Sequence, residues 1–270
     1  MNNFVLDRKF GREAFGIDPG GYHAARPAYP DWVFEMLLDR GCLVRGGHAF
    51  EIGAGTGIAT RRLLDLGADT LVAIEPDNRM ADFLRRTFPD KKLTVMPSTF
   101  EDVSLPDNSF DFGFCATAFH WLNEEASLLK AGQLLRPGGW WAMVWNVFSN
   151  PNLSDPFHEA TKVLLQGPAS PADIVGGIPF ALDTKLRLAA IQRTGIFSAV
   201  EHRVSEWSLV LKPEQVVALY ATYSNINIRE DKETILTELG RIARDEFNGK
   251  VTRNMTTSLY IAQRKSDLLP

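Results

Sequence analysis

The stretch FEIGAGTGIATRRLL, residues 50–64, sets three glycines at alternate positions between an apolar run and a helical pattern. Glycines at this spacing let the backbone turn tightly and bring its amide groups close to a ligand. A dinucleotide-binding loop has the spacing G-x-G-x-x-G/A, but here Ile58 stands at the place of the third small residue. The stretch predicts a loop that binds a nucleoside-containing cofactor.

Two carboxylates near this loop help to identify the cofactor. Glu51 is expected at the end of a strand just before the glycines, where its charge would repel a pyrophosphate on the same amides. It suits a cationic ligand such as S-adenosylmethionine, which carries an ammonium, a sulfonium and no phosphate. Glu75 ends the next expected strand, about 20 residues after the glycines, where a carboxylate accepts hydrogen bonds from ribose hydroxyls. Glu75 therefore fits either cofactor, whereas Glu51 favours S-adenosylmethionine over NAD.

Composition narrows the class of protein. The chain has 270 residues, 45% of them hydrophobic, and a net charge of -4, which disfavours a broad nucleic-acid surface. Cys42 and Cys115 lack metal-ligand spacing and are expected to be buried reduced thiols, so no metal is predicted. The N-terminus shows no secretion signal and no apolar run is long enough for a membrane span. We expect a soluble, cytoplasmic protein without membrane or nucleic-acid partners, and its oligomeric state stays open.

Short apolar runs alternate with helical patterns along much of the chain, which predicts an α/β fold with a parallel, doubly wound sheet. The expected strands are His48–Ile52, Leu71–Glu75, Leu93–Met96, Phe110–Ala116 and Trp140–Trp145, with edge strands at Val200–Leu211 and Thr256–Arg264. Asp31–Asp39 is expected as a helix before the sheet. Residues 136–139, Arg-Pro-Gly-Gly, are expected as a turn that leads into the next strand.

We predict one domain over residues 1–270. Its parts are an N-terminal cap with a leading helix (1–46), a cofactor-binding core (47–148), a lid and substrate region with an edge strand (149–250) and a C-terminal edge strand (251–270). The lid prediction follows from the change to a Pro-, Gly-, Ser- and Asn-rich composition after residue 149.

Four motifs in a fixed order carry a family resemblance. They are E-I-G-A-G-T-G (51–57), A-I-E-P (73–76), S-F-D-F-G-F-C-A-T-A-F-H-W (109–121) and L-L-R-P-G-G (134–139). Together they resemble the class I S-adenosylmethionine-dependent methyltransferases, in particular the methyltransferase type 11 group. The segment Y-H-A-A-R-P-A-Y-P (22–30) is similar to a subgroup that includes trans-aconitate methyltransferase-like proteins. The resemblance implies a Rossmann-like, mostly parallel seven-stranded sheet with helices on both faces and helical lid insertions.

The resemblance also implies a set of cofactor-binding residues. These are Tyr22, Arg26, Glu51, Gly53, Ala54, Gly55, Gly57, Glu75, Pro76, Met80, Thr99, Phe100, Glu101, Ala116 and Thr117. Many relatives have an aspartate at the place of Thr99, so a backbone contact from Phe100 is expected to replace it at the adenine. Tyr22 and Arg26 are neighbours at helical spacing, and Arg26 is expected to bind the cofactor carboxylate with its guanidinium fork.

The acceptor is expected beyond the fourth strand, where open α/β sheets bind ligands. His120 is the candidate catalytic base, with Trp121, Tyr220, Tyr223 and Arg229 as further substrate-binding residues. A hydroxyl acceptor would need such a base, whereas an ionised carboxylate would not. The packing alternative for His120 stays open, and Trp141, Trp145 and Trp207 are expected in the core.

These observations favour methyl transfer to a small molecule, with an acidic O-methyl acceptor as the finer expectation. A catalytically silent adenosylmethionine-binding protein is the first alternative, and an NAD-dependent oxidoreductase is a weaker one. An RNA or protein methyltransferase is disfavoured because the chain is acidic and shows no appended basic module.

Overall fold

The computed structural model describes residues 7, 14–150, 152–167, 170–172 and 178–266. Its strands are β1 (His48–Ile52), β2 (Thr70–Ile74), β3 (Leu93–Met96), β4 (Phe110–Ala116), β5 (Leu135–Val147), β6 (Phe197–Leu211) and β7 (Val251–Arg264). They form a single sheet in the order β3-β2-β1-β4-β5-β7-β6. Strands β1 to β5 run parallel, and β7 is antiparallel to β5 and β6. The predicted seven-stranded, mostly parallel sheet is confirmed.

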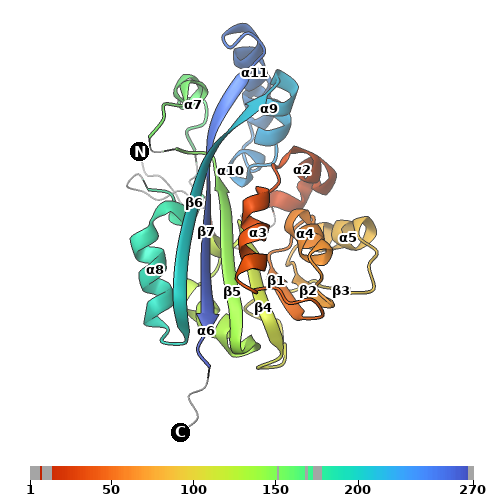
Figure 1. The fold of residues 1–270 in the computed structure, drawn as a ribbon. Helices are drawn as coiled ribbons and strands as arrows, with labels where there is room; N and C mark the ends of the chain where they lie inside the picture. The colour runs from red at the N-terminus through yellow and green to blue at the C-terminus, as the bar shows by residue number, and fades with distance from the viewer. Residues whose placement is uncertain (1–6, 8–13, 151, 168–169, 173–177, 267–270) are drawn as a thin grey trace.

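Helices cover both faces of this sheet (Figure 1). They are η1 (Ala14–Ile17), α2 (Pro19–Ala25), α3 (Asp31–Asp39), α4 (Ile58–Asp65), α5 (Asn78–Thr87), η2 (Phe119–Trp121), α6 (Glu124–Leu134), α7 (Pro156–Thr161), η3 (Phe180–Leu182), α8 (Thr184–Arg193), α9 (Pro213–Tyr220), α10 (Ser224–Asn227) and α11 (Lys232–Asp245). Alternate residues of the strands face opposite layers, as the period of two requires. Phe112 and Phe114 of β4 pack with α3 and α4, whereas Trp141 and Met143 of β5 pack with α6 and α8.

The position of β7 corrects one prediction. We expected a C-terminal edge strand, but β7 lies between β5 and β6, and β6 is the edge. The central part of β7 is almost fully buried although it includes Thr256, Thr257 and Ser258. Each hydroxyl donates a hydrogen bond, to Ser149 O (2.7 Å), Asn146 Oδ1 (2.7 Å) and Ala181 O (3.0 Å) respectively. These bonds satisfy polar groups that the sequence pattern alone suggests are exposed.

Several strand boundaries also differ from the expectation: β6 begins at Phe197 and β7 at Val251, both earlier than expected, and β2 and β5 are shifted as well. Strand β2 ends at Ile74, so Glu75 begins the loop that follows it. Strand β5 begins at Leu135 and includes the residues expected as a turn. A register shift between Phe110 and Phe112 of β4 accommodates them, and Gly138 has a φ of 79° within that irregular section.

A separate hydrophobic cluster lies beyond the carboxyl end of β5. The pairing of β5 with β7 ends at Val147 and Thr256, but β6 and β7 stay paired as far as Leu211 and Val251. Helices α7, α9 and α11 lie beside this projecting ribbon in the upper part of Figure 1. Their buried side chains form one cluster that includes Phe157. The helical part of the predicted lid region is thus placed at the edge of the sheet where the parallel strands end.

Parts of the predicted regions lie outside the described residues, namely most of the N-terminal cap before Ala14, positions 151, 168–169 and 173–177, and the last four residues. Within the part of the chain that is described, none of the helices combines the length and apolar character that a membrane crossing needs.

Candidate functional site

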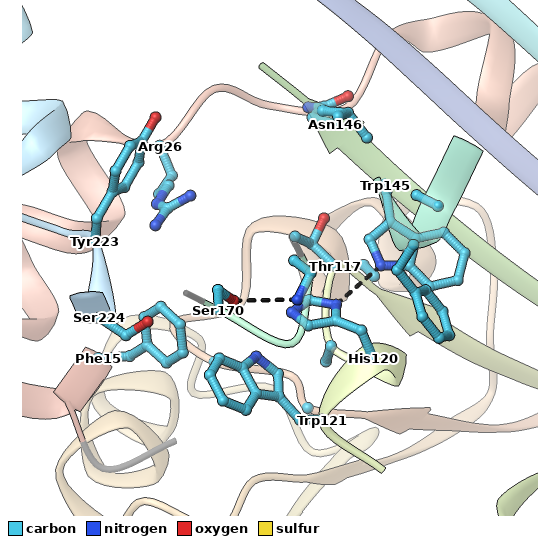
Figure 2. A pocket seen from close by; sticks show the side chains of 18 of the residues that line it. Phe15, Arg26, Thr117, His120, Trp121, Trp145, Asn146, Ser170, Tyr223 and Ser224 are labelled. Atoms are coloured by element: carbon cyan, nitrogen blue, oxygen red, sulfur yellow. Dashed lines mark hydrogen bonds between the residues drawn. The ribbon is translucent and has the colours of Figure 1, made fainter. Parts of the chain in front are cut away.

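A cavity of about 460 Å³ opens at the carboxyl ends of β1, β2, β4 and β5. This is the edge at which open α/β sheets bind ligands. Residues from η1, α2, α9, α10 and β7 complete its walls. Figure 2 shows Arg26 and Tyr223 on one side of this cavity, with His120 and Trp145 on the other.

Fourteen of the predicted site residues line the cavity. They are Tyr22, Arg26, Gly53, Gly55, Glu75, Pro76, Met80, Phe100, Ala116, Thr117, His120, Trp121, Tyr220 and Tyr223. The remaining six do not line it, and they are Glu51, Ala54, Gly57, Thr99, Glu101 and Arg229. Folding thus gathers residues from four separate motifs and from the lid into one space.

The glycine loop follows β1 with backbone conformations that favour glycine. Gly53, Gly55 and Gly57 have φ values of 66°, 56° and 90°, a region in which side chains are strained. A Cβ on Gly53 would also lie 2.4 Å from the Cβ of Ala118. Gly57 instead caps the start of α4 and packs against α5, where a Cβ would meet Leu84 at 2.5 Å. The loop presents Gly53 and Gly55 to the cavity, and Gly57 serves the helix.

Glu75 joins this loop to the next one. One of its carboxylate oxygens accepts a hydrogen bond from the Gly55 N–H at 2.8 Å, and the other accepts from the Asp77 N–H at 2.9 Å. The residue is 7% exposed and lines the cavity beside Pro76 and Met80. Charged acceptors hold such N–H donors strongly, so the acid is fixed at the cavity wall.

Glu51 lies behind the glycine loop. It is 1% exposed and accepts a hydrogen bond from the Thr60 hydroxyl at 2.6 Å. Burial raises the pKa of its carboxyl to about 8, with Glu75 adding to the rise and Thr60 opposing it. Without a cationic partner, this carboxyl is mostly protonated at neutral pH.

Thr99, Phe100 and Glu101 were expected to bind the cofactor, and of these only Phe100 reaches the cavity. The Thr99 hydroxyl donates to Asp102 Oδ2 at 2.7 Å and accepts from the Asp102 N–H at 3.1 Å, which closes a local turn. Glu101 is exposed. The structure therefore directs the side chain of Thr99 away from the cavity, and the expected replacement of its role by Phe100 stays a prediction.

Arg26 lies between two aromatic rings at the opposite wall. Its guanidinium carbon is 5.1 Å from the centre of the Tyr22 ring and 4.7 Å from that of Tyr223. Its Nη2 donates to Thr222 O at 3.1 Å, and its Nε is buried without a hydrogen-bond partner among the described residues. Such stacking orients a guanidinium at little entropic cost, which leaves a donor available to a ligand.

His120 and Trp121 form η2 directly after β4 and enclose the other end of the cavity. His120 is 5% exposed, and its Nδ1 accepts a hydrogen bond from Trp145 Nε1 at 3.1 Å. Trp145 was expected only in the core; it is buried in the core, and it also lines the cavity. Phe180, 6.2 Å from the His120 ring, adds a further aromatic wall.

The expectation for Arg229 is wrong. Its guanidinium pairs with Asp231 at 2.7 Å and donates to Gln166 O at 2.6 Å, and it does not line the cavity. The nearby carboxylate, two residues along the chain, holds the side chain on the surface of the lid. Arg229 therefore has no place in the acceptor pocket.

Arg253 of β7, which the sequence analysis missed, supplies a cation at the cavity instead. It is 3% exposed, pairs with Asp155 at 2.7 Å and hydrogen-bonds to the Tyr220 hydroxyl. Its Nη2 makes no hydrogen bond within the described residues. Among the described residues that line the cavity, Arg26 and Arg253 are the guanidiniums and Glu75 is the carboxylate. No motif marks Arg253, because it reaches the site through sheet pairing.

The described part of the chain contains no candidate metal site. In the described ranges, no group of three or more His, Cys, Asp or Glu side chains gathers as a metal site. The titratable groups of the cavity are spread over its walls.

Comparisons with known proteins agree with the fold and the glycine loop. Residues 50–143 match the family described as a methyltransferase domain. An uncharacterized methyltransferase of Mycobacterium tuberculosis is 35% identical over 133 residues, which cover 49% of this chain and 52% of that protein. The chain thus spans about half the length of this curated relative.

Solved structures extend the likeness in fold. A structure described as a putative type II methyltransferase from Anaeromyxobacter dehalogenans has a TM-score of 0.61 and 19% identity, covering 89% of this chain and 97% of that one. A phosphoethanolamine N-methyltransferase 2 from Haemonchus contortus, in complex with S-adenosylhomocysteine, has a TM-score of 0.60 and 13% identity, covering 98% of this chain and 62% of that one. The chain has the Rossmann-like methyltransferase fold. Its residues 50–143 are similar to the methyltransferase domain family.

Proposed function

We propose that the protein is an S-adenosylmethionine-dependent methyltransferase that acts on a small molecule. The observation that carries the proposal is the cavity wall in which Glu75 accepts a hydrogen bond from Gly55 of the glycine loop. This arrangement offers a ribose acceptor beside backbone amides, inside a domain of methyltransferase type. The bound S-adenosylhomocysteine in the nematode structure supports the choice of cofactor.

Several residues have the chemistry to hold this cofactor. Glu75 would accept from the ribose hydroxyls, Phe100 and Met80 would pack on the adenosine, and Arg26 would bind the carboxylate. Glu51 lies behind the loop and would act on the ammonium electrostatically, gaining its own charge as the ligand binds. The bound sulfonium supplies an activated methyl group, so the protein needs chiefly to hold the acceptor in line with it.

The finer proposal is an acidic acceptor that is methylated on oxygen. Aromatic walls with a few polar groups are usual for small-ligand pockets, and the acceptor end offers Trp121, Trp145 and Phe180. Arg253 takes the role first expected of Arg229, because its Nη2 is able to bind a carboxylate. An ionised carboxylate attacks the methyl carbon directly and requires no base.

Turnover is the test of this function. The protein is incubated with S-adenosylmethionine and a small-molecule cell extract, and S-adenosylhomocysteine is measured together with products heavier by one methylene. Formation of both supports the proposal. Tight cofactor binding without turnover over a wide range of extracts would favour the silent adenosylmethionine-binding protein. Preferred binding of NAD would favour the oxidoreductase, which the alternate glycines and Glu51 argue against.

A further inference from the structure

The hydrogen bond between Trp145 and His120 restricts which nitrogen of His120 carries a proton. An indole Nε1–H is only a donor. Since Trp145 Nε1 lies 3.1 Å from His120 Nδ1, that nitrogen must be the acceptor and therefore has no hydrogen. The neutral imidazole then has its proton on Nε2. Figure 2 shows this bond on one side of the ring and a second dashed line to Ser170 on the other side, where the Ser170 hydroxyl is able to accept from Nε2–H.

The alternative protonation states conflict with this geometry. A base acting through Nε2 has its own proton on Nδ1, and that N–H would face the N–H of Trp145. Both donors would then lack an acceptor in a buried place, because Trp145 is 2% and His120 5% exposed. The imidazolium formed after proton uptake has the same conflict. The bond thus opposes a general-base role for His120.

Packing keeps the two rings in this arrangement. The Trp145 ring is 5.8 Å from Phe180 and 6.1 Å from Tyr260, which meets it edge-on. The His120 ring lies 5.3 Å from Trp121 and 6.2 Å from Phe180. The Tyr260 hydroxyl in turn donates to Ala181 O at 2.8 Å, next to Phe180. Neither ring can turn to present another atom without displacing a buried neighbour.

We propose that Trp145 is a positioning residue that holds His120 with its Nε2–H as a hydrogen-bond donor at the acceptor end of the cavity. This inference rests on the proposed methyl transfer. The proposed ionised acceptor needs no base: its oxygen lone pair forms the bond to the methyl carbon, and the electrons of the carbon–sulfur bond stay on sulfur. The sulfonium becomes a neutral thioether, the acceptor loses one negative charge, and no proton is released. His120 keeps its proton on the side of Ser170 and takes up no proton from the acceptor.

The protonation state is measured directly by nitrogen NMR of the full chain labelled at histidine ring nitrogens, with His120→Gln used to assign the signal. We expect protonated Nε2 and bare Nδ1 at neutral pH in the wild type. Trp145→Phe should give a mixture of tautomers. Trp141→Phe is the matched control, since Trp141 lies on the same strand, its Nε1 has no partner in the described part of the chain, and it does not line the cavity. A proton on Nδ1 in the wild type, or an unchanged tautomer in Trp145→Phe, would overturn the inference. This readout needs no turnover, so it is independent of the proposed function.

Kinetic measurements on His120 variants distinguish a hydrogen-bond donor from a general base. A glutamine side chain offers an N–H near the place of Nε2 but accepts no proton at neutral pH. S-adenosylhomocysteine formation should therefore fall less in His120→Gln than in His120→Ala, and by less than the roughly 10²-fold that loss of a base costs. Wild-type kcat should not rise with pH through the histidine range. Equal losses of that size in both variants, with a wild-type rate that does rise, would show that His120 is the base.

Discussion

The carboxylate of Glu75 and the backbone N–H of Gly55 are joined by a 2.8 Å hydrogen bond, which ties the end of β2 to the glycine loop after β1. The acid therefore has two tasks if the cofactor binds here, since it shapes the loop and accepts from the ribose. Neither task can be transferred to Asp77, whose carboxylate accepts from Arg79.

From this relationship we expect Glu75→Ala to weaken S-adenosylmethionine binding by about 1 to 3 kcal/mol, because a charged acceptor is lost. Calorimetry measures the change in dissociation constant. Glu101→Ala serves as the control, because Glu101 was predicted at the same site but does not line the cavity. Wild-type affinity in Glu75→Ala would remove Glu75 from the cofactor site.

Arg26 should recognise the amino-acid part of the cofactor. Arg26→Lys loses the planar stack on Tyr22 and Tyr223 and the Nε donor, so S-adenosylhomocysteine should bind at least about tenfold more weakly. Binding of 5′-methylthioadenosine, which lacks the carboxylate, should hardly change. If both ligands lose affinity equally, Arg26 has a structural role between the N-terminal cap and the lid and does not contact the carboxylate.

Glu51 gives the stability of the ligand-free protein a distinct pH dependence. Burial raises its pKa to about 8 in the folded state from an ordinary value of 4.5, so between these values the folded state holds a proton that the unfolded state has released. The free energy of unfolding should therefore decrease as pH rises through this window, by on the order of 1.4 kcal/mol per pH unit from this group alone. Below the lower value the contribution is fully present, and above pH 8 it is lost.

Urea unfolding at pH 5 and pH 8 tests this, with Glu51→Gln for comparison. The glutamine variant should lose less stability over that range than the wild type. An identical pH dependence in the two proteins would show that Glu51 is not protonated when folded. Calorimetry in buffers of different ionisation enthalpy should also show proton release when S-adenosylmethionine binds to the wild type at pH 7.

Short local motifs explain which site residues could be predicted from the sequence. The glycine loop, Glu75 and His120 each follow a parallel strand within a few residues, so the carboxyl edge of the sheet gathers them whatever the rest of the chain does. Arg253 and Phe180 carry no such signal, and they reach the cavity from β7 and from the lid region. Trp145 does lie near the carboxyl end of a parallel strand, but it was assigned only to the core.

An ion pair with a nearby carboxylate explains why the prediction for Arg229 failed. Arg229 looked like an anion-binding residue, but Asp231 lies two positions away and captures it. The position of β7 inside the sheet could not be predicted either. Its buried Thr257 and Ser258 look like exposed residues in the sequence, because the groups that accept their hydroxyl hydrogen bonds are distant along the chain. The hydrophobic periodicity of a strand shows which of its residues share a face. It does not show which strands are its neighbours in the sheet.

The acceptor pocket should distinguish an acid from its amide. We expect the protein saturated with S-adenosylhomocysteine to bind phenylacetate more tightly than phenylacetamide, and Arg253→Lys to reduce that preference by about tenfold. Thermal unfolding of the variant checks that the buried pair with Asp155 still forms. Equal binding of acid and amide by the wild type would contradict the acidic-acceptor proposal and leave the methyltransferase proposal intact.

Hydrogen exchange should show the N-terminal segment responding to the cofactor. Tyr22 and Arg26 line the cavity, and the Tyr29 hydroxyl lies 2.7 Å from the Thr117 hydroxyl at the end of β4. Amides of residues 22–30 should gain protection from exchange when S-adenosylmethionine binds, because contacts with the ligand would hold this segment closed over the cavity. Equal exchange with and without the cofactor would mean that this segment only packs against the sheet.

The most direct measurement of the central claim is a pair of calorimetric titrations of the protein, one with S-adenosylmethionine and one with NAD. The account predicts saturable one-to-one binding of S-adenosylmethionine that is lost or strongly weakened in Glu75→Ala, and no binding of NAD at the same concentrations. Binding of NAD in preference to S-adenosylmethionine, or no binding of S-adenosylmethionine at all, would contradict it.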